Sequence, residues 1–276
     1  MNEEEASRKW YSVRKDDFKL TCDCIDEVLK QHGRIPFIIY AIYRLVLALY
    51  FFTFLIFFGV SSAEFLGVKF LIYLTDWTYI LATLYLIVAC FNTIATTSCY
   101  CIGGCIGKGV VRNQFQWLLL NISATVSMIV TVVYWTALRP FMNEKLPIYL
   151  DITIHLLPAI ICLVDILLTT VIVRFVHVVY PFVYLFIYLL FAVIYWAAGG
   201  TDPAGNPFIY PIIDFGNYPG IAVASVFGVC LATLLAQAAL KGLYALRHRY
   251  IDELRLTGTI SHHSHEVLEV QLEDQS

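Results

Sequence analysis

The sequence predicts an all-α membrane protein: a polytopic bundle of six transmembrane helices with both termini in the cytosol. Composition gives the first reason, since 59% of the 276 residues are hydrophobic and only 14% are charged, which lies far outside the average of soluble domains. Long unbroken apolar runs give the second reason, because a membrane barrel would show short alternating strands instead. The formal net charge of −3 gives no indication of nucleic-acid binding.

Six segments are long enough to cross a bilayer, which takes about 20 apolar residues in a helix. We expect them near residues 36–59, 69–96, 115–137, 148–172, 178–198 and 220–245. These spans divide Lys and Arg very unevenly, and the positive-inside rule therefore places both termini in the cytosol. The side of the termini holds Arg8, Lys9, Arg14, Lys15, Lys19, Lys30, Arg34, Lys108, Arg112, Arg174, Lys241, Arg247, Arg249 and Arg255, and the other side holds Lys69, Arg139 and Lys145.

The chain divides into three parts. Residues 1–34 form a polar cytosolic segment, residues 35–246 the transmembrane domain, and residues 247–276 a cytosolic tail that we expect to be disordered. The N-terminal segment has no apolar core near Met1, so the first apolar span is expected to act as its own insertion signal.

Two ionisable residues fall in the cytosolic half of the bundle. Arg44 lies in the first span, and Asp165 lies near the cytosolic end of the fourth. An ionised side chain within a membrane needs a partner or a function. We therefore predict that Arg44 and Asp165 form a structural ion pair.

Polar side chains also gather at one level of the other half of the bundle. The second span carries Thr75 and Asp76 within "LIYLTDWTYI", roughly 10 Å below the non-cytosolic surface at 1.5 Å per helical residue. In the fourth span His155 lies at about the same depth, with Asp151 one turn above it. Residues four apart share a helix face, so these four side chains are expected to lie close together.

This set allows three interpretations. Thr75 could act as a nucleophile with His155 as its base and Asp151 or Asp76 to orient the imidazole. Alternatively, the threonine bonds a carbonyl of its own helix and the histidine joins two helices, which spacing alone favours. A zinc site of Asp76, Asp151 and His155 is a third interpretation, but no second histidine lies on this side. No metal and no cofactor are expected.

Cysteines cluster in the short cytosolic connection between the second and third spans. Cys99, Cys101 and Cys105 would lie at the membrane surface. Reversible palmitoylation and ordinary free thiols in a reducing compartment are equally compatible with this position.

Small residues recur every fourth position along the sixth span. They are Ala224, Gly228, Ala232 and Ala236. Such a stripe allows two helix backbones to approach closely in lipid. The contact would be either within the bundle or between the protomers of an oligomer.

The loop after the fifth span, residues 199–219, is rich in Gly and Pro and has no Lys or Arg. We expect it to fold over the mouth of a pocket on the side of the threonine and histidine, with Tyr210 and Pro211 turning back towards the bundle. Trp77, Trp196 and Tyr210 are expected to line that pocket, which would be apolar for acyl chains and polar at the reacting end. The alternative is an exposed loop beside an ordinary aromatic belt.

The chain resembles the androgen-induced-protein family of six-span membrane proteins, and more closely its rolling-stone branch. The segments that carry this resemblance are "FLIYLTDWTYIL" (70–81), "VVYWTALRP" (132–140), "LDITIHLLPAIICLVDILL" (150–168) and "YLLFAVIYWAAGGTDPAGNPFIYPIID" (188–214). Their order and spacing agree with the family pattern. The resemblance implies a six-helix membrane fold over roughly residues 40–240.

The resemblance implies two different functions. Characterised androgen-induced proteins hydrolyse fatty-acid esters of hydroxy fatty acids, which would make Thr75 the nucleophile and His155 the base of a lipid-ester hydrolase. Rolling-stone proteins are instead associated with myoblast fusion, and this is the non-enzymatic alternative of fusion or adhesion. This chain departs from the hydrolases at Asp151, where they have Asn, and at Asp76 and the insert "TDPAGN". The expected partners are membrane lipids and, for a hydrolase, a lipid ester. The protein is expected in the plasma membrane or the endoplasmic reticulum.

Overall fold

The computed structural model describes residues 18–20, 36–102, 110–141 and 146–273. Every element in these ranges is a helix, which confirms the all-α character that the sequence predicts. Five helices are long and apolar enough to cross a membrane, and a sixth candidate span consists of two helices that meet at an angle of 45°. In chain order the elements are α2 (Phe37–Leu66), η2 (Gly67–Ile72), α3 (Leu74–Ile102), α4 (Val110–Val133), η3 (Tyr134–Leu138), η4 (Arg139–Phe141), α5 (Ile148–His155), α6 (Leu157–Leu168), η5 (Phe175–Val178), α7 (Val179–Ala197), η6 (Pro211–Ile213) and α8 (Pro219–Glu273).

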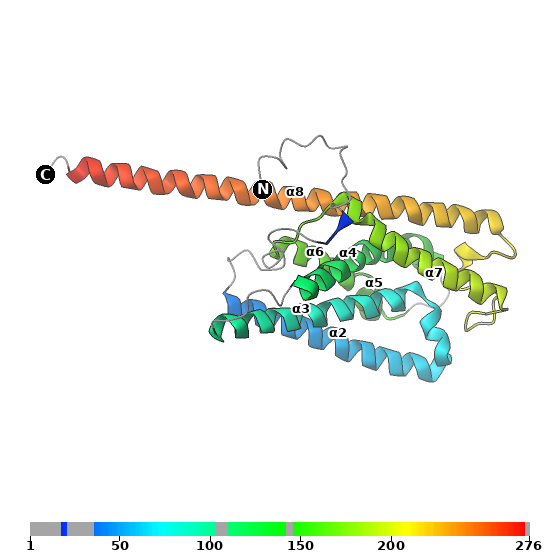
Figure 1. The fold of residues 1–276 in the computed structure, drawn as a ribbon. Helices are drawn as coiled ribbons and strands as arrows, with labels where there is room; N and C mark the ends of the chain where they lie inside the picture. The colour runs from blue at the N-terminus through cyan, green and yellow to red at the C-terminus, as the bar shows by residue number, and fades with distance from the viewer. Residues whose placement is uncertain (1–17, 21–35, 103–109, 142–145, 274–276) are drawn as a thin grey trace.

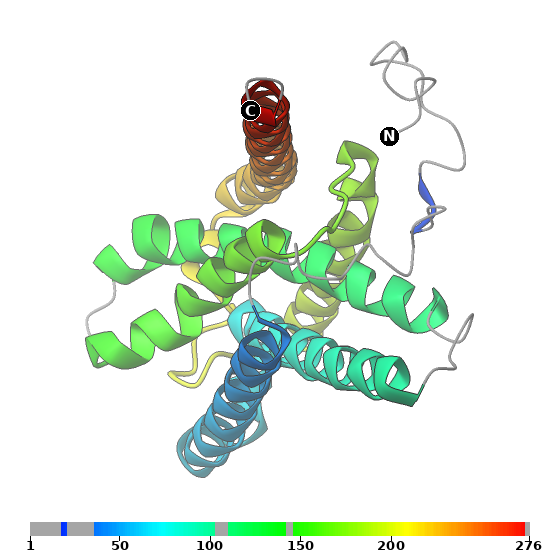
Figure 2. The same ribbon diagram turned by 90° about the vertical axis from the view of Figure 1, so that its left-hand side faces the viewer.

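Helices α2 and α8 lie on opposite sides of the bundle, and the other helices lie between them (Figures 1 and 2). On α2 a buried stripe at helical spacing contains Tyr40, Arg44, Ala48 and Phe51. The rest of this helix exposes large apolar side chains. A helix with one buried stripe and an apolar outer surface suits a position at the lipid boundary.

Helix α4 is the central element, because it packs against α3, α6, α7 and α8. Its buried surface includes several hydrogen-bonding side chains, among them Asn121, Ser123 and Thr125. The Thr125 hydroxyl donates to the Gln237 side chain of α8 over 2.9 Å. Interhelical hydrogen bonds of this kind hold helices together in lipid, where apolar contact alone gives little preference.

The predicted ion pair is confirmed. The Nη1 atom of Arg44 lies 2.5 Å from a carboxylate oxygen of Asp165, and both side chains are fully buried. Three phenols complete the cluster: the Tyr40 hydroxyl accepts from the guanidinium, and the Tyr43 and Tyr85 hydroxyls donate to the carboxylate over 2.9 and 2.6 Å. This cluster joins α2, α3 and α6.

The fourth span differs from the expected single helix over residues 148–172. It is broken at Leu156 into α5 and α6, and α6 ends at Leu168. Pro158 explains the break, because proline has no N–H for the carbonyl of Ile154 and its ring clashes with that carbonyl. Pro158, three residues after His155, therefore bends the chain at Leu156, directly after this histidine.

Other boundaries also differ from those expected. The first span is longer and continues through the η2 turn as far as Ile72. Helix α8 continues to Glu273, through the segment predicted to be a disordered tail (Figure 1). Cys105 and the side chains of Cys99 and Cys101 lie outside the described part of the structure, so the proposed acylation of this connection stays a prediction.

The small-residue stripe of α8 divides into two halves. Ala236 is buried and Ala232 partly buried, and both pack against α4 side chains such as Val126. Ala224 and Gly228 are exposed, so this half of the stripe is not used for packing within the chain. Its use between protomers stays a prediction.

The η2 turn and residues 198–218 lie at the same end of the bundle, on the right in Figure 1, and we call this the loop end. The ammonium group of Lys69 donates to the Thr201 hydroxyl over 2.8 Å and to the Asp202 carbonyl over 3.1 Å. These bonds connect the turn between α2 and α3 to the loop between α7 and α8.

Candidate functional site

A cavity of about 340 Å³ lies among α3, α4, α7, α8 and the η6 turn. Most of its lining is aliphatic or aromatic. The side chains that carry a hydroxyl group are Thr75, Tyr134, Tyr188, Tyr210, Ser225 and Thr233. The combination of apolar walls and a few polar groups is typical of sites for small apolar ligands.

The loop end of the cavity is closed by the segment around η6. Tyr210, Ile212 and Ile213 all line the cavity, and the Tyr210 hydroxyl accepts a hydrogen bond from the Leu74 N–H over 3.0 Å. The loop thus turns back into the bundle at Tyr210 and Pro211, as the sequence predicts. Pro211 favours this turn because its fixed φ suits the first residue of a short helix.

Thr75 lies in the first turn of α3 and faces the cavity. The Thr75 hydroxyl is within hydrogen-bonding reach of the Tyr210 phenol, and the Tyr188 hydroxyl is also within reach of this phenol. The Tyr188 hydroxyl donates to the Ile72 carbonyl over 2.9 Å. Burial raises the pKa of the Tyr210 phenol, the negative charge of Asp76 raises it further, and the hydrogen bond to Thr75 lowers it.

Asp76 is half-buried in the first turn of α3. A carboxylate is favourable there because the positive end of the helix dipole lies at the N-terminus. It lies close enough to Tyr210, Tyr188 and Tyr73 to interact with their phenols electrostatically. Asp76 is therefore a neighbour of the hydroxyl groups of Thr75, Tyr188 and Tyr210. Among the described residues it makes no ion pair with His155.

Asp151 is fully buried and is engaged by two groups that the sequence interpretation missed. Its carboxylate accepts from Arg139 Nε over 2.8 Å and from the Tyr134 hydroxyl. The sequence contained one indication that Arg139 could be this partner, because Arg139 is one of only three basic residues on the predicted non-cytosolic side. The pair holds the end of the third span to the start of the fourth.

His155 lies against the face of Tyr134, with ring centroids 3.3 Å apart and planes 3° from parallel. Its Nδ1 atom is 3.1 Å from the Asp151 carbonyl oxygen and 3.8 Å from a carboxylate oxygen. Tyr134 lines the cavity, whereas His155 does not. Within the described residues no hydrogen bond joins His155 to Thr75, so their roles as base and nucleophile stay a prediction.

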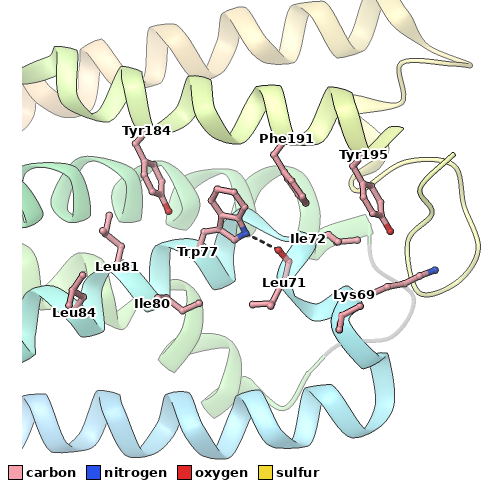
Figure 3. Close-up of a pocket in the computed structure, with 11 residues that line it drawn as sticks. Lys69, Leu71, Ile72, Trp77, Ile80, Leu81, Leu84, Tyr184, Phe191 and Tyr195 are labelled. Carbon is pink, nitrogen blue, oxygen red and sulfur yellow. Dashed lines mark hydrogen bonds between the residues drawn. The ribbon is translucent and has the colours of Figure 1, made fainter. Parts of the chain in front are cut away.

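The two tryptophans that were expected in the pocket lie elsewhere. Trp77 packs edge-on against Tyr188 at a centroid distance of 5.4 Å, and its indole N–H donates to the Leu71 carbonyl over 2.8 Å. It lines a separate open groove between α3 and α7 (Figure 3). Trp196 packs against Phe215 at 5.6 Å and is absent from the lining of the Thr75 cavity.

The zinc set, which was the third interpretation of these residues, is not brought together. In the described part of the chain, no three His, Cys, Asp or Glu side chains gather closely enough to hold a metal ion. His155 and Asp151 share a helix face as expected, but the Asp151 carboxylate already holds Arg139.

Comparison with known proteins identifies the family. The family model described as "Protein rolling stone" matches residues 27–265. The protein of that name from Drosophila melanogaster is 29% identical over 220 residues, covering 77% of this chain and 79% of the relative. No solved structure matches. Because the family model covers far more than half of the sequence, this chain belongs to the rolling stone family of proteins.

Proposed function

We propose that this chain is a non-enzymatic multi-pass membrane protein that acts in cell fusion or adhesion at the plasma membrane. Membership of the rolling stone family is the observation that carries the proposal. It favours the fusion function that the resemblance implies over the hydrolase function of the androgen-induced proteins.

The side chains named as a catalytic set give independent support, because their contacts are those of structural residues. The Asp151 carboxylate pairs with Arg139 and Tyr134, and its oxygen lies 3.8 Å from His155 Nδ1, which is longer than a hydrogen bond. His155 stacks on Tyr134, and Thr75 is next to Tyr210. Each group therefore has a partner that holds two elements together.

A cell-mixing assay tests the proposal. Two cell populations carry the two halves of a split fluorescent protein, and the chain is expressed in one population, in both or in neither. We expect expression to raise the number of fluorescent fused cells or of mixed aggregates over the vector control. The variant Thr75→Val, which removes the hydroxyl and keeps the shape, should preserve this gain at equal surface expression.

A chain that reaches the cell surface without raising either fusion or aggregation would contradict the proposal. Loss of the gain in Thr75→Val with retention in Thr75→Ser would also contradict it, because the threonine hydroxyl would then be essential for function.

The second candidate function is a lipid-ester hydrolase, and one observation favours it. The Thr75 hydroxyl lines an apolar cavity, where an acyl chain could lie beside a nucleophile. A fluorophosphonate probe separates the two functions. A hydrolase would be labelled in the wild type and unlabelled in Thr75→Ala at equal expression, whereas the non-enzymatic proposal predicts no labelling of either protein at Thr75.

A further inference from the structure

The cavity beside Thr75 has an unequal distribution of polar groups. Its walls are apolar and include Leu185, Leu189 and Val229. The hydroxyls of Thr75 and Tyr210 lie together where the η6 turn closes it. Three other hydroxyls of the lining are already used, since Thr233 donates to the Val229 carbonyl over 2.7 Å, Tyr134 donates to Asp151, and Tyr188 donates to the Ile72 carbonyl over 2.9 Å.

The cavity also opens sideways. Helices α7 and α8 make few contacts with each other, and the lining includes exposed residues from both of them. Phe186 on α7 is 58% exposed, and Cys230 on α8 is exposed as well. In a membrane this side of the bundle would face lipid, so an apolar chain could enter between α7 and α8 without crossing water.

The charges around the cavity restrict the head group of such a ligand. None of the lining residues is Lys, Arg or His, so a carboxylate or phosphate would be buried without a cation. The ionisable side chain beside the Thr75 and Tyr210 hydroxyls is the acidic Asp76, whereas Arg139 lies behind Tyr134 and is already paired with Asp151. Burying an unpaired charge is costly, whereas hydroxyl groups can exchange hydrogen bonds with Thr75 and Tyr210.

The geometry points to a binding site for one neutral single-chain lipid with a hydroxyl head group, such as a monoacylglycerol. Its chain lies between α4, α7 and α8, and its head group contacts Thr75 and Tyr210. The volume of about 340 Å³ is near the lower end of the range of roughly 300–1,000 Å³ of small-molecule sites, which suits one chain better than the two of a phospholipid. The site does not depend on whether the chain acts in fusion.

Photocrosslinking tests the site in the full chain reconstituted in phosphatidylcholine nanodiscs. Three probes carry the same diazirine-alkyne chain and differ in their head group: a monoacylglycerol, a fatty acid and a phosphatidylcholine. We expect the monoacylglycerol to label the lining segments of α7 and α8 most strongly. Val229→Trp fills the cavity and should reduce labelling about tenfold, a loss of about 1.4 kcal/mol of binding free energy.

Val223→Trp is the matched control, because Val223 is an exposed residue of the same helix that does not line the cavity. It should leave labelling unchanged. Thr75→Val should weaken monoacylglycerol labelling by about 2- to 10-fold, as expected for one lost hydrogen bond, and Thr75→Ser should restore it. Asp76→Asn should raise fatty-acid labelling, because it removes the acidic side chain beside Tyr210.

A second measurement avoids cavity-filling substitutions. Alkylation of Cys230 in the otherwise wild-type protein, followed by peptide mass spectrometry, should be slowed by monoolein and not by oleate. Equal labelling by the fatty acid or phosphatidylcholine probe would overturn the proposal. So would equal effects of the two Trp substitutions, or a rate of Cys230 alkylation that monoolein does not change.

Discussion

Arg44 and Asp165 show how this chain keeps charges within a membrane domain. The guanidinium and the carboxylate bond each other and three phenols, so most of their hydrogen-bonding capacity is used. Removal of one partner leaves the other charge buried and unpaired, which typically costs about 3–5 kcal/mol. We expect Arg44→Met and Asp165→Leu each to lower the thermal unfolding midpoint in detergent and the yield of folded protein.

The double variant Arg44→Met/Asp165→Leu should recover part of this loss, because it leaves no unpaired charge. Replacement of a buried ion pair by apolar residues is often close to neutral. A double variant no more stable than the worse single variant would show that the two residues act independently.

Asp214 stabilises the chain just before α8 through local hydrogen bonds. Its carboxylate accepts from the N–H groups of Asn217 and Gly216 over 2.9 and 3.1 Å and from the Asn217 side chain over 2.9 Å. The bonds from Asn217 hold the pKa of Asp214 below its ordinary value. A lowered pKa means that this stabilisation is complete above the ordinary pKa and is lost as the pH falls through the lower value of the folded protein.

Acidification from about pH 6 to about pH 3 should therefore lower the unfolding midpoint of the wild type more than that of Asp214→Asn. The asparagine variant should start from a lower midpoint at the higher pH, because its amide cannot replace both carboxylate oxygens. Parallel pH profiles of the two proteins would contradict this role.

At the scale of helices, the break between α5 and α6 is stabilised by a contact from α4. The Thr131 hydroxyl lies 2.5 Å from the His155 carbonyl oxygen and 2.7 Å from that of Ser127. A carbonyl at a helix break needs a donor from outside its own helix. Thr131→Val should destabilise the protein by about 1–3 kcal/mol, and Thr131→Ser should restore most of the loss.

Chemical denaturation followed by the near-ultraviolet signal of the aromatic residues would measure this effect. Thr136→Val is a suitable control, because the Thr136 hydroxyl donates to the Val132 carbonyl of its own chain segment over 2.6 Å. An equal loss of stability in the two valine variants would mean that the contact across the break contributes nothing.

The helices were predictable because their signal is local, whereas the site depends on contacts between distant segments. Length and apolar composition located the five long apolar helices and the bent helix pair, and the need to pair buried charges identified Arg44 with Asp165. Spacing placed Asp151 and His155 on one helix face. It could not show that Arg139 and Tyr134 would donate hydrogen bonds to the Asp151 carboxylate. That contact depends on how the π-helical turn of η3 ends the third span.

At the scale of the whole molecule, the orientation in the membrane determines which leaflet contains each feature. At the loop end, Lys69 is hydrogen-bonded to the 198–218 segment. The N-terminus of α3, with Thr75 in its first turn, lies at the same end. The Arg44–Asp165 cluster lies farther along the spans. If the termini are cytosolic, the cavity lies in the outer or lumenal leaflet and the ion-pair cluster in the cytosolic leaflet.

Epitope tags test this orientation directly. Tags fused to either terminus should be stained only after the plasma membrane is permeabilised, because the side of the termini carries fourteen of the Lys and Arg residues that flank the spans, against three on the other side. A third tag in the exposed Asp202–Asn206 turn, where the asparagine side chain donates to the aspartate carboxylate, should be stained in intact cells if the chain is at the plasma membrane. Insertion there should be tolerated because the turn is exposed. Staining of either terminal tag without permeabilisation would contradict the six-span orientation, and it would move the cavity beside Thr75 to the opposite leaflet.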